Sequence, residues 1–179
     1  MKAYELTISG FGGQGVLLMG QLMAYAANKS GHATSWLPAY GPEMRGGTAN
    51  CMVVVADEAI DSPFIINPSA VIAMNKPSLE RFEPQLKENG LLVMNADMID
   101  KVNSRDDVKT CKIHADKIAG MLGEKKVANL VALGAFIRAS KLVELNIAIE
   151  CLKYVINSEK EELLKLNIMA LQAGYREAN

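Results

Sequence analysis

A glycine-rich segment near the start of the chain has the residue types and spacing of a phosphate-binding loop. Residues 10–15 read GFGGQG and match G-x-G-x-x-G, between a strand-like apolar stretch and a helical pattern. Glycines permit positive φ and a tight turn, and their missing side chains let backbone N–H groups approach a pyrophosphate. The N-terminus of the following helix adds unpaired donors and partial positive charge. We therefore predict that the loop of residues 10–15 contacts a phosphate-bearing ligand.

Two other interpretations of these glycines stay open. In a dinucleotide site, an acidic residue about 20 positions further on holds the ribose hydroxyls. Here the expected second strand ends at Leu37 and Pro38, and the first carboxylate beyond it is that of Glu43. This lowers the weight of a self-sufficient NAD(P)-dependent oxidoreductase without removing it. The third interpretation is purely structural: the glycines permit close packing or shape a subunit interface.

A second loop is unusual in composition. Residues 38–48 read PAYGPEMRGGT and follow the second expected strand, so they lie at the same carboxyl edge of the sheet as the first loop. Arg45 can pair bidentately with a phosphate or a carboxylate, and Gly46 and Gly47 let the backbone pass close beneath a ligand or a neighbouring chain. The alternative for Arg45 is an ion pair with Glu43 or with a carboxylate of a partner.

The elements that must position these loops follow from hydrophobic periodicity and turn residues. The pattern predicts strands over 4–9, 33–37, 49–55, 70–74, 91–95 and 109–114, with Pro38 ending the second strand. It predicts helices from 14 to 30, from about Ser78 with a break or kink at Pro84, around 130–137, over 145–156, and from the capping box of Ser158 and Glu161 to a stop at Gly174. This alternation predicts an α/β fold with a Rossmann-like, doubly wound, mainly parallel sheet and a helical C-terminal third. No linker stands out, so residues 1–179 are expected to form a single domain.

Composition narrows the function. The chain of 179 residues has a formal net charge of -1, which offers no basic surface for nucleic acid or a membrane. A carboxylate at Glu5 and the turn glycines leave no room for a signal peptide, so we expect a cytoplasmic protein. Cys51, Cys111 and Cys151 form no Cys-x-x-Cys, which predicts buried reduced thiols rather than a metal site in this chain. His32 and His114 are expected to be structural, and no catalytic constellation stands out.

The two glycine-containing segments together, GFGGQG at 10–15 and GPEMRGG at 41–47, resemble the gamma subunit of 2-oxoacid:ferredoxin oxidoreductases. The resemblance extends from Tyr4 through the helical tail. It implies a Rossmann-like domain that packs beside the active centre of a complex whose whole activity is the oxidative decarboxylation of a 2-oxoacid to an acyl-coenzyme A. The form of the second segment is more similar to the 2-oxoglutarate or branched-chain types, with pyruvate left open.

The resemblance also implies a division of labour. Thiamine diphosphate, magnesium and iron–sulfur clusters would be held by alpha, beta and ferredoxin-like delta subunits, with ferredoxin as the acceptor, and the isolated chain would be inactive. Coenzyme A would lie at or near this chain, and a homodimer of the isolated chain is a further expectation. Asn75 and Lys76 follow an apolar strand and reach the same edge, where Lys76 is either a phosphate ligand or a solvated lysine. The candidate ligand-binding residues are Gly10, Gly12, Gly13, Gln14, Gly15, Tyr40, Arg45, Gly46, Gly47, Thr48 and Asn75.

Overall fold

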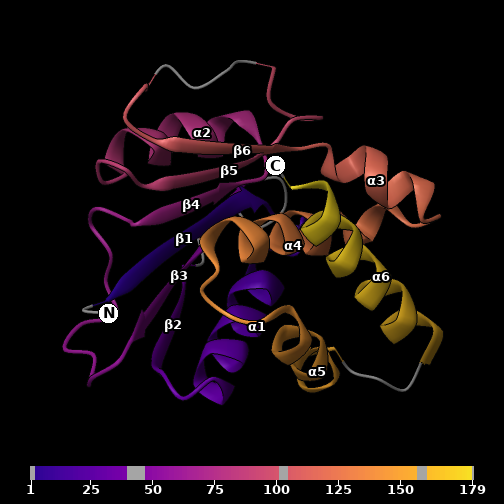
Figure 1. Cartoon of the computed structure of the whole chain (residues 1–179). Helices are drawn as coiled ribbons and strands as arrows, with labels where there is room; N and C mark the ends of the chain where they lie inside the picture. The colour runs from indigo at the N-terminus through magenta and orange to yellow at the C-terminus, as the bar shows by residue number, and fades with distance from the viewer. Residues whose placement is uncertain (1–2, 40–46, 101–104, 157–160, 179) are drawn as a thin grey trace.

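The protein is built around one six-stranded sheet. The computed structural model describes residues 3–39, 47–100, 105–156 and 161–178. The strand order is β2-β3-β1-β4-β5-β6, as Figure 1 shows. The strands are β1 (Tyr4–Phe11), β2 (Ala33–Ala39), β3 (Thr48–Ala56), β4 (Ala70–Ala73), β5 (Leu91–Asn95) and β6 (Lys109–Ile113).

The sheet has a parallel part and an antiparallel part, which meet at β1. The strands β1, β4, β5 and β6 run parallel to one another, whereas β3 is antiparallel to both β1 and β2. The mainly parallel sheet predicted from the sequence is therefore confirmed. Because β2 runs in the same direction as β1, the segments that leave β1, β2, β4, β5 and β6 all emerge at one edge, here called the carboxyl edge.

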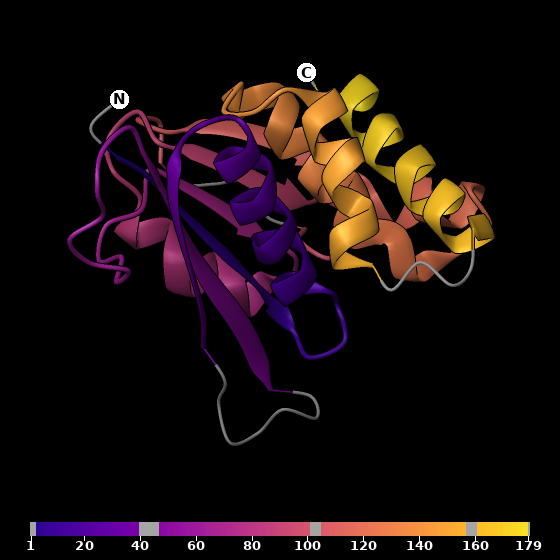
Figure 2. The ribbon, with the colours of Figure 1, turned by 90° about the horizontal axis from the view of Figure 1, so that it is seen from below.

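Helices cover the two faces of the sheet unequally. Figures 1 and 2 show α1 (Val16–Lys29), α4 (Ala128–Ser140), α5 (Leu145–Val155) and α6 (Glu161–Glu177) on one face and α2 (Lys76–Phe82) on the other. The larger core lies on the first face, where Leu6, Ile8 and Ile72 are fully buried beneath the helices. The smaller core joins Val71 and Leu92 to Leu79 and Phe82 of α2 and to Leu86, which directly follows the short 3-10 turn η1 (Glu83–Gln85). The remaining elements, α3 (Ala115–Met121) and the turn η2 (Lys125–Val127), connect β6 to α4.

Several boundaries differ from those expected from the sequence. Pro38 does not end β2, because β2 is an edge strand and a missing N–H on its free side costs no ladder bond. Strand β1 continues through Phe11, so Gly10 belongs to the strand. Helix α2 begins at Lys76 rather than Ser78, because the side chain of Asn75 accepts a hydrogen bond from the Ser78 N–H and caps it. Helix α3 was not predicted, since seven residues give too little periodicity.

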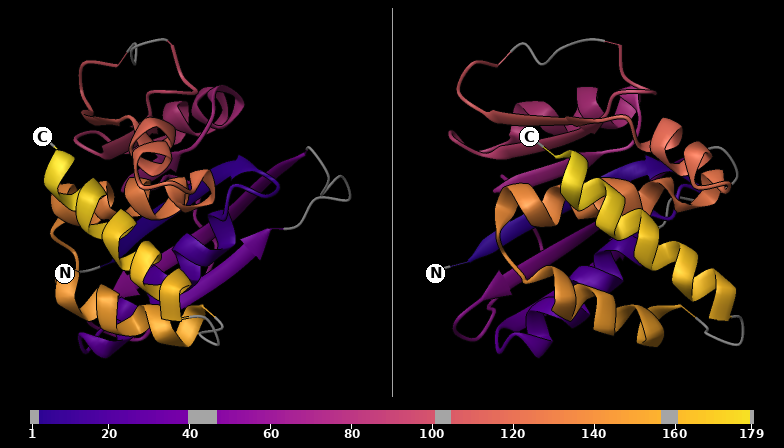
Figure 3. Two further views of the ribbon diagram at one scale, coloured as in Figure 1. Left: turned by 90° about the vertical axis from the view of Figure 1, so that its right-hand side faces the viewer. Right: turned by 45° about the vertical axis from the view of Figure 1, so that its right-hand side comes forward.

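The expectation that Gly174 stops the last helix is wrong. Helix α6 continues to Glu177 and crosses α4, as Figure 3 shows, and Gly174 packs against Val131 of α4. A Cβ atom on Gly174 would overlap the carbonyl oxygen of Val131, and one on Gly134 would overlap that of Leu171. The two glycines therefore let the backbones of α4 and α6 touch. The predicted capping residue Ser158 lies outside the described residues.

Candidate functional site

The glycine loop joins the end of β1 to the start of α1 at the carboxyl edge. Gly12 and Gly13 are exposed, and Gly13 and Gly15 have positive φ of 94° and 68°. Gly15 is the N-cap of α1, and no side chain makes a capping hydrogen bond there. The loop therefore combines a left-handed backbone with a helix N-terminus that leaves N–H groups of its first turn without intrahelical partners, the arrangement that favours an anion.

The glycines of the motif differ in the space around them. A Cβ on Gly10 would lie 2.8 Å from Gln14 Oε1, 2.9 Å from Val16 Cγ2 and 3.0 Å from Met74 Cβ, so this position is closed by packing. A Cβ on Gly15 would overlap the side chain of Asn129. At Gly13, by contrast, no atom lies within 4 Å of the Cβ position. Of these three positions, Gly13 alone opens outward to where a ligand could lie.

A polar network supports the loop from below. The Oε1 atom of Gln14 accepts hydrogen bonds from the backbone N–H of Phe11 at 2.7 Å and from Asn75 Nδ2 at 3.1 Å. Asn75 Oδ1 accepts from the Ser78 N–H at 3.0 Å, and Asn75 is only 1% exposed. The structure thus brings together the two predicted residues Gln14 and Asn75, in an arrangement that fixes the loop against β4 and α2.

Sequence reasoning missed three polar residues that complete this support. Asn129 Nδ2 donates to the Gly15 carbonyl oxygen at 3.3 Å from a position 114 residues away. The hydroxyl of Ser9 donates to Ser78 Oγ at 2.9 Å, and both serines are fully buried. The only signal for Asn129 is its type, a polar residue within an otherwise apolar helical run.

The second predicted loop ends beside the first. Thr48 pairs with Phe11 in the β1–β3 ladder, and the Gly47 carbonyl oxygen accepts a hydrogen bond from the Gly12 N–H at 3.1 Å. The predicted residues Tyr40, Arg45 and Gly46 lie outside the described residues. Lys76 is half-exposed and stands 3.9 Å from Glu80 one helical turn on, which is the geometry of a solvated surface lysine.

A second junction at the carboxyl edge, between β5 and α3, is organised by side chains. Asp97 accepts a hydrogen bond from the Lys117 N–H at 2.8 Å and lies 2.7 Å from His114 Nδ1. Burial raises the pKa of Asp97, but these hydrogen bonds outweigh it, so the pKa lies below its ordinary value. Asn95 Oδ1 accepts from the Ala115 N–H. His114 is thus held by a helix-capping carboxylate, consistent with the structural role expected for it.

The three cysteines are buried, as predicted. Burial raises the pKa of Cys51 to about 12, which keeps this thiol protonated at neutral pH. Within 3–39, 47–100, 105–156 and 161–178, no three His, Cys, Asp or Glu side chains are grouped as metal ligands. None of the described helices is both long and apolar enough to cross a bilayer.

Comparison with known proteins identifies the class to which this fold and loop belong. Residues 5–177 match the model of the pyruvate ferredoxin/flavodoxin oxidoreductase family, and the chain belongs to that family. Within it, the chain is of the gamma-subunit type: the gamma subunit of a keto/oxoacid ferredoxin oxidoreductase from Geobacter sulfurreducens superposes with a TM-score of 0.86 and 29% identity, over 99% of this chain and 97% of that one. The resemblance drawn from the two glycine-containing segments is thereby confirmed.

Longer relatives contain the same unit. The ketoisovalerate oxidoreductase subunit VorA of Methanothermobacter marburgensis is 36% identical over 97% of this chain, but the chain spans only 36% of VorA. A 2-oxoglutarate:ferredoxin oxidoreductase from Magnetococcus marinus, solved with 2-oxoglutarate, coenzyme A and succinyl-CoA bound, has a TM-score of 0.89 at 22% identity; 98% of this chain matches 31% of that one. At that identity the similarity is evidence of a shared fold.

Proposed function

We propose that this chain is the gamma subunit of a complex that oxidatively decarboxylates a 2-oxoacid to an acyl-coenzyme A and passes the electrons to ferredoxin. Family membership and the match to a whole gamma subunit support this. The relatives named above act, by their names, on ketoisovalerate and on 2-oxoglutarate, which favours a branched-chain 2-oxoacid or 2-oxoglutarate over pyruvate. We propose that residues 1–179 form a single domain. We also propose that the protein is located in the cytoplasm.

The role proposed for this chain within the complex is to hold coenzyme A. The observation that carries it is Gly13, which has a positive φ and open space at its Cβ position, at the N-terminal end of α1. A diphosphate is the part of coenzyme A that such a loop recognises, because backbone N–H groups and the helix dipole both favour dense negative charge. The coenzyme A in the solved structure of the Magnetococcus enzyme supports the choice of ligand.

The redox chemistry is assigned to companion subunits. This sequence has no Cys-x-x-Cys, and its three cysteines are buried with raised pKa values. We propose that alpha, beta and ferredoxin-like delta subunits hold thiamine diphosphate, magnesium and the iron–sulfur clusters. This chain by itself would then turn over no 2-oxoacid.

Affinity purification of the tagged chain from its native host under anaerobic conditions, followed by mass spectrometry, tests the assignment to a complex. We expect subunits with thiamine-diphosphate and ferredoxin-like sequences to co-purify, and their identities will narrow the 2-oxoacid. A chain that purifies alone, is stable and binds NAD(P) would overturn the proposal in favour of a self-sufficient oxidoreductase.

The coenzyme A role is tested by Gly13→Ala in the assembled complex. The matched control is Gly31→Ala at the other end of α1, because Gly31 has φ of 91° and equally open space at its Cβ position. Both variants carry the same backbone strain, but we expect only Gly13→Ala to raise the KM for coenzyme A, by about tenfold or ~1.4 kcal/mol. The KM for the 2-oxoacid serves as the internal reference. An equal, small effect of both substitutions on coenzyme A would refute the assignment of the loop.

A further inference from the structure

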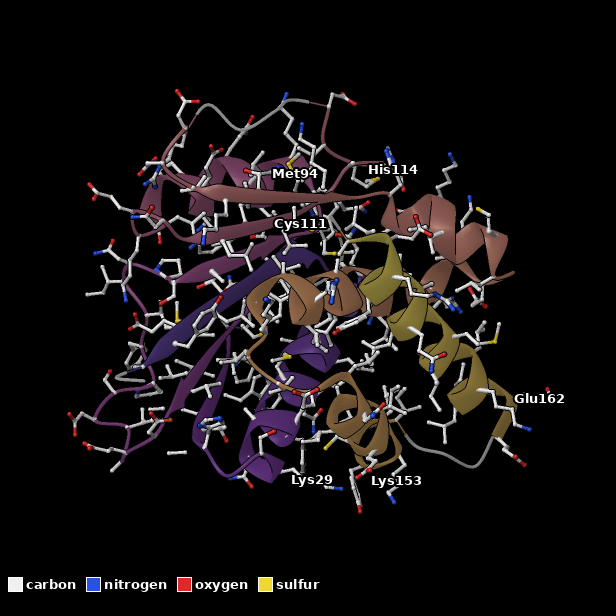
Figure 4. The ribbon with its side chains drawn as sticks, in the orientation of Figure 1. Lys29, Met94, Cys111, His114, Lys153 and Glu162 are labelled. Carbon is white, nitrogen blue, oxygen red and sulfur yellow. The ribbon has the colours of Figure 1, made fainter. Side chains whose placement is uncertain are left out.

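A groove separate from the glycine loop lies where α3, the end of β6 and the last turns of α6 meet. Its volume is about 580 Å³, and Ile113, Ile118 and Met121 contribute to its apolar lining. The side chain of Met121 is 80% exposed, although methionine is a residue type that is usually buried. Figure 4 labels His114, another lining residue, at the end of β6 beside this place. The groove therefore presents apolar surface that the described part of the chain leaves uncovered.

Among the described residues, two lysines and one glutamate carry the formal charges of the groove lining. Lys112 and Lys117 line it and are exposed, and neither ammonium group makes an ion pair with a described residue. The nearby carboxylate of Asp97 is already engaged by His114 and by the Lys117 N–H. Glu177 is the one carboxylate that the described residues contribute to the lining. An occupant that combines an apolar side chain with carboxylates would complement this surface.

The groove lies at the same edge of the sheet as the glycine loop. Strands β1, β4, β5 and β6 are parallel, so the end of β6 and the end of β1 share the carboxyl edge. Three strand spacings separate them, which is about 14 Å. If coenzyme A lies at the glycine loop, the companion subunit that bears the active centre must approach this edge, and the groove faces that approach.

We propose that the groove receives a segment of the companion subunit, an apolar side chain flanked by Asp or Glu, which docks beside Met121 and pairs with Lys112 and Lys117. The inference rests on the proposed function, since it requires the hetero-oligomer. Met121 adapts to the shape of the incoming side chain, and the two lysines set its orientation.

The test measures the dissociation constant between the purified chain and its companion subcomplex under anaerobic conditions. We expect Lys117→Glu combined with Met121→Glu to weaken binding at least 30-fold. The control is Lys153→Glu on α5, the same charge reversal at an exposed lysine that Figure 4 shows well away from His114; we expect less than a twofold change. Thermal unfolding of each isolated chain checks that the variants fold.

A second variant, which removes a negative charge from the groove, is expected not to weaken binding. Glu177→Gln removes the lining carboxylate, so we expect binding that is equal to wild type or several-fold tighter. Zero-length carbodiimide coupling of the assembled complex, which joins amines to carboxylates in contact, should link Lys112 or Lys117 to Asp or Glu of the companion.

The possible failures are distinguishable. If the wild-type chain binds no companion subcomplex, the proposed function fails together with this inference. If the wild-type chain binds but the double variant binds equally well, only the groove assignment is overturned. Cross-links from Lys117 to a second copy of this chain, detected with isotopically mixed protein, would overturn the companion in favour of self-association.

Discussion

Glycine is used in two opposite ways in this molecule. In the glycine loop, Gly13 has no neighbouring atom within 4 Å of its Cβ position. At the α4–α6 crossing, Gly134 and Gly174 leave no space at all, because backbone carbonyl oxygens of the facing helix occupy it. In the proposed function, the absence of a side chain at Gly13 leaves room for a ligand. At Gly134 and Gly174, it leaves room for the backbone of the facing helix. Substitution by alanine should separate the two regions.

The largest effect is expected at the helix crossing. Gly174→Ala places a methyl group on the Val131 carbonyl oxygen, so the helices must separate. We expect a loss of about 3 kcal/mol in the free energy of unfolding, or roughly 6–12 °C in Tm for a chain of this size. The control is Gly120→Ala on α3, where no atom lies within 4 Å and we expect a gain of about 0.5–1 kcal/mol. Equal stability of the two variants would contradict the packing role.

Gly15 shares a feature with each region, since it has the positive φ of the loop and a Cβ position filled by a neighbouring residue. Gly15→Ala combines positive φ with overlap of the Asn129 side chain, and we expect a cost of about 2 kcal/mol. In the double variant with Asn129→Ala, the overlap is gone but the backbone strain stays. Urea unfolding of the four proteins should therefore give a coupling energy of about 1 kcal/mol. Strict additivity would show that Asn129 does not close this position.

The polar support of the loop gives a smaller effect. Gln14→Met keeps the length of the side chain but removes the acceptor for the Phe11 N–H and for Asn75 Nδ2. We expect a loss of about 1–2 kcal/mol, since two donors lose their partner. The matched control is Gln172→Met on α6, because the side chain of Gln172 makes no hydrogen bond with the described residues. A loss no greater than that of the control would show that Gln14 does not stabilise the loop.

The junction between β5 and α3 predicts the smallest effect and a pH dependence. Asp97→Asn should cost about 1 kcal/mol at pH 7, because it removes the negative charge that accepts the Lys117 N–H at the N-terminus of α3. The pKa of Asp97 in the folded protein lies below its ordinary value of 3.8. The stabilisation is therefore complete above pH 3.8 and is lost as the pH falls through the lower folded pKa. Urea unfolding from pH 7 to pH 3 should show the difference between wild type and variant shrinking. A constant difference would assign the effect to shape rather than charge.

Local pattern was enough to predict most elements of the fold. Alternating and continuous apolar runs placed the strands, and helical spacing placed α1, which ends at Lys29, just before the left-handed Gly31. Position in the sheet was not available locally, so Pro38 was interpreted as a stop although an edge strand accepts it. The role of Gly174 depends on Val131, which lies on another helix far earlier in the sequence.

Only part of the candidate site could be predicted from the sequence. The motif gave the loop, and the end of an apolar strand gave Asn75. The contact between Asn129 and Gly15 was not predictable, because the two residues are 114 positions apart and no sequence pattern links them. Residues that contact a turn through tertiary structure leave no periodic signal. The functional assignments of the loop residues stay predictions.

The distance in sequence between Gly15 and Asn129 has a consequence for biosynthesis. The glycine loop is translated early, but the side chain that packs against Gly15 belongs to α4, in the last third of the chain. Strand β1 likewise acquires its parallel neighbour only when residues 70–73 are available. Such non-local pairing slows folding and exposes apolar strands in the meantime. The nascent chain should therefore present an unfinished loop to its surroundings until α4 has left the ribosome, which makes it a candidate client for chaperones during most of its synthesis.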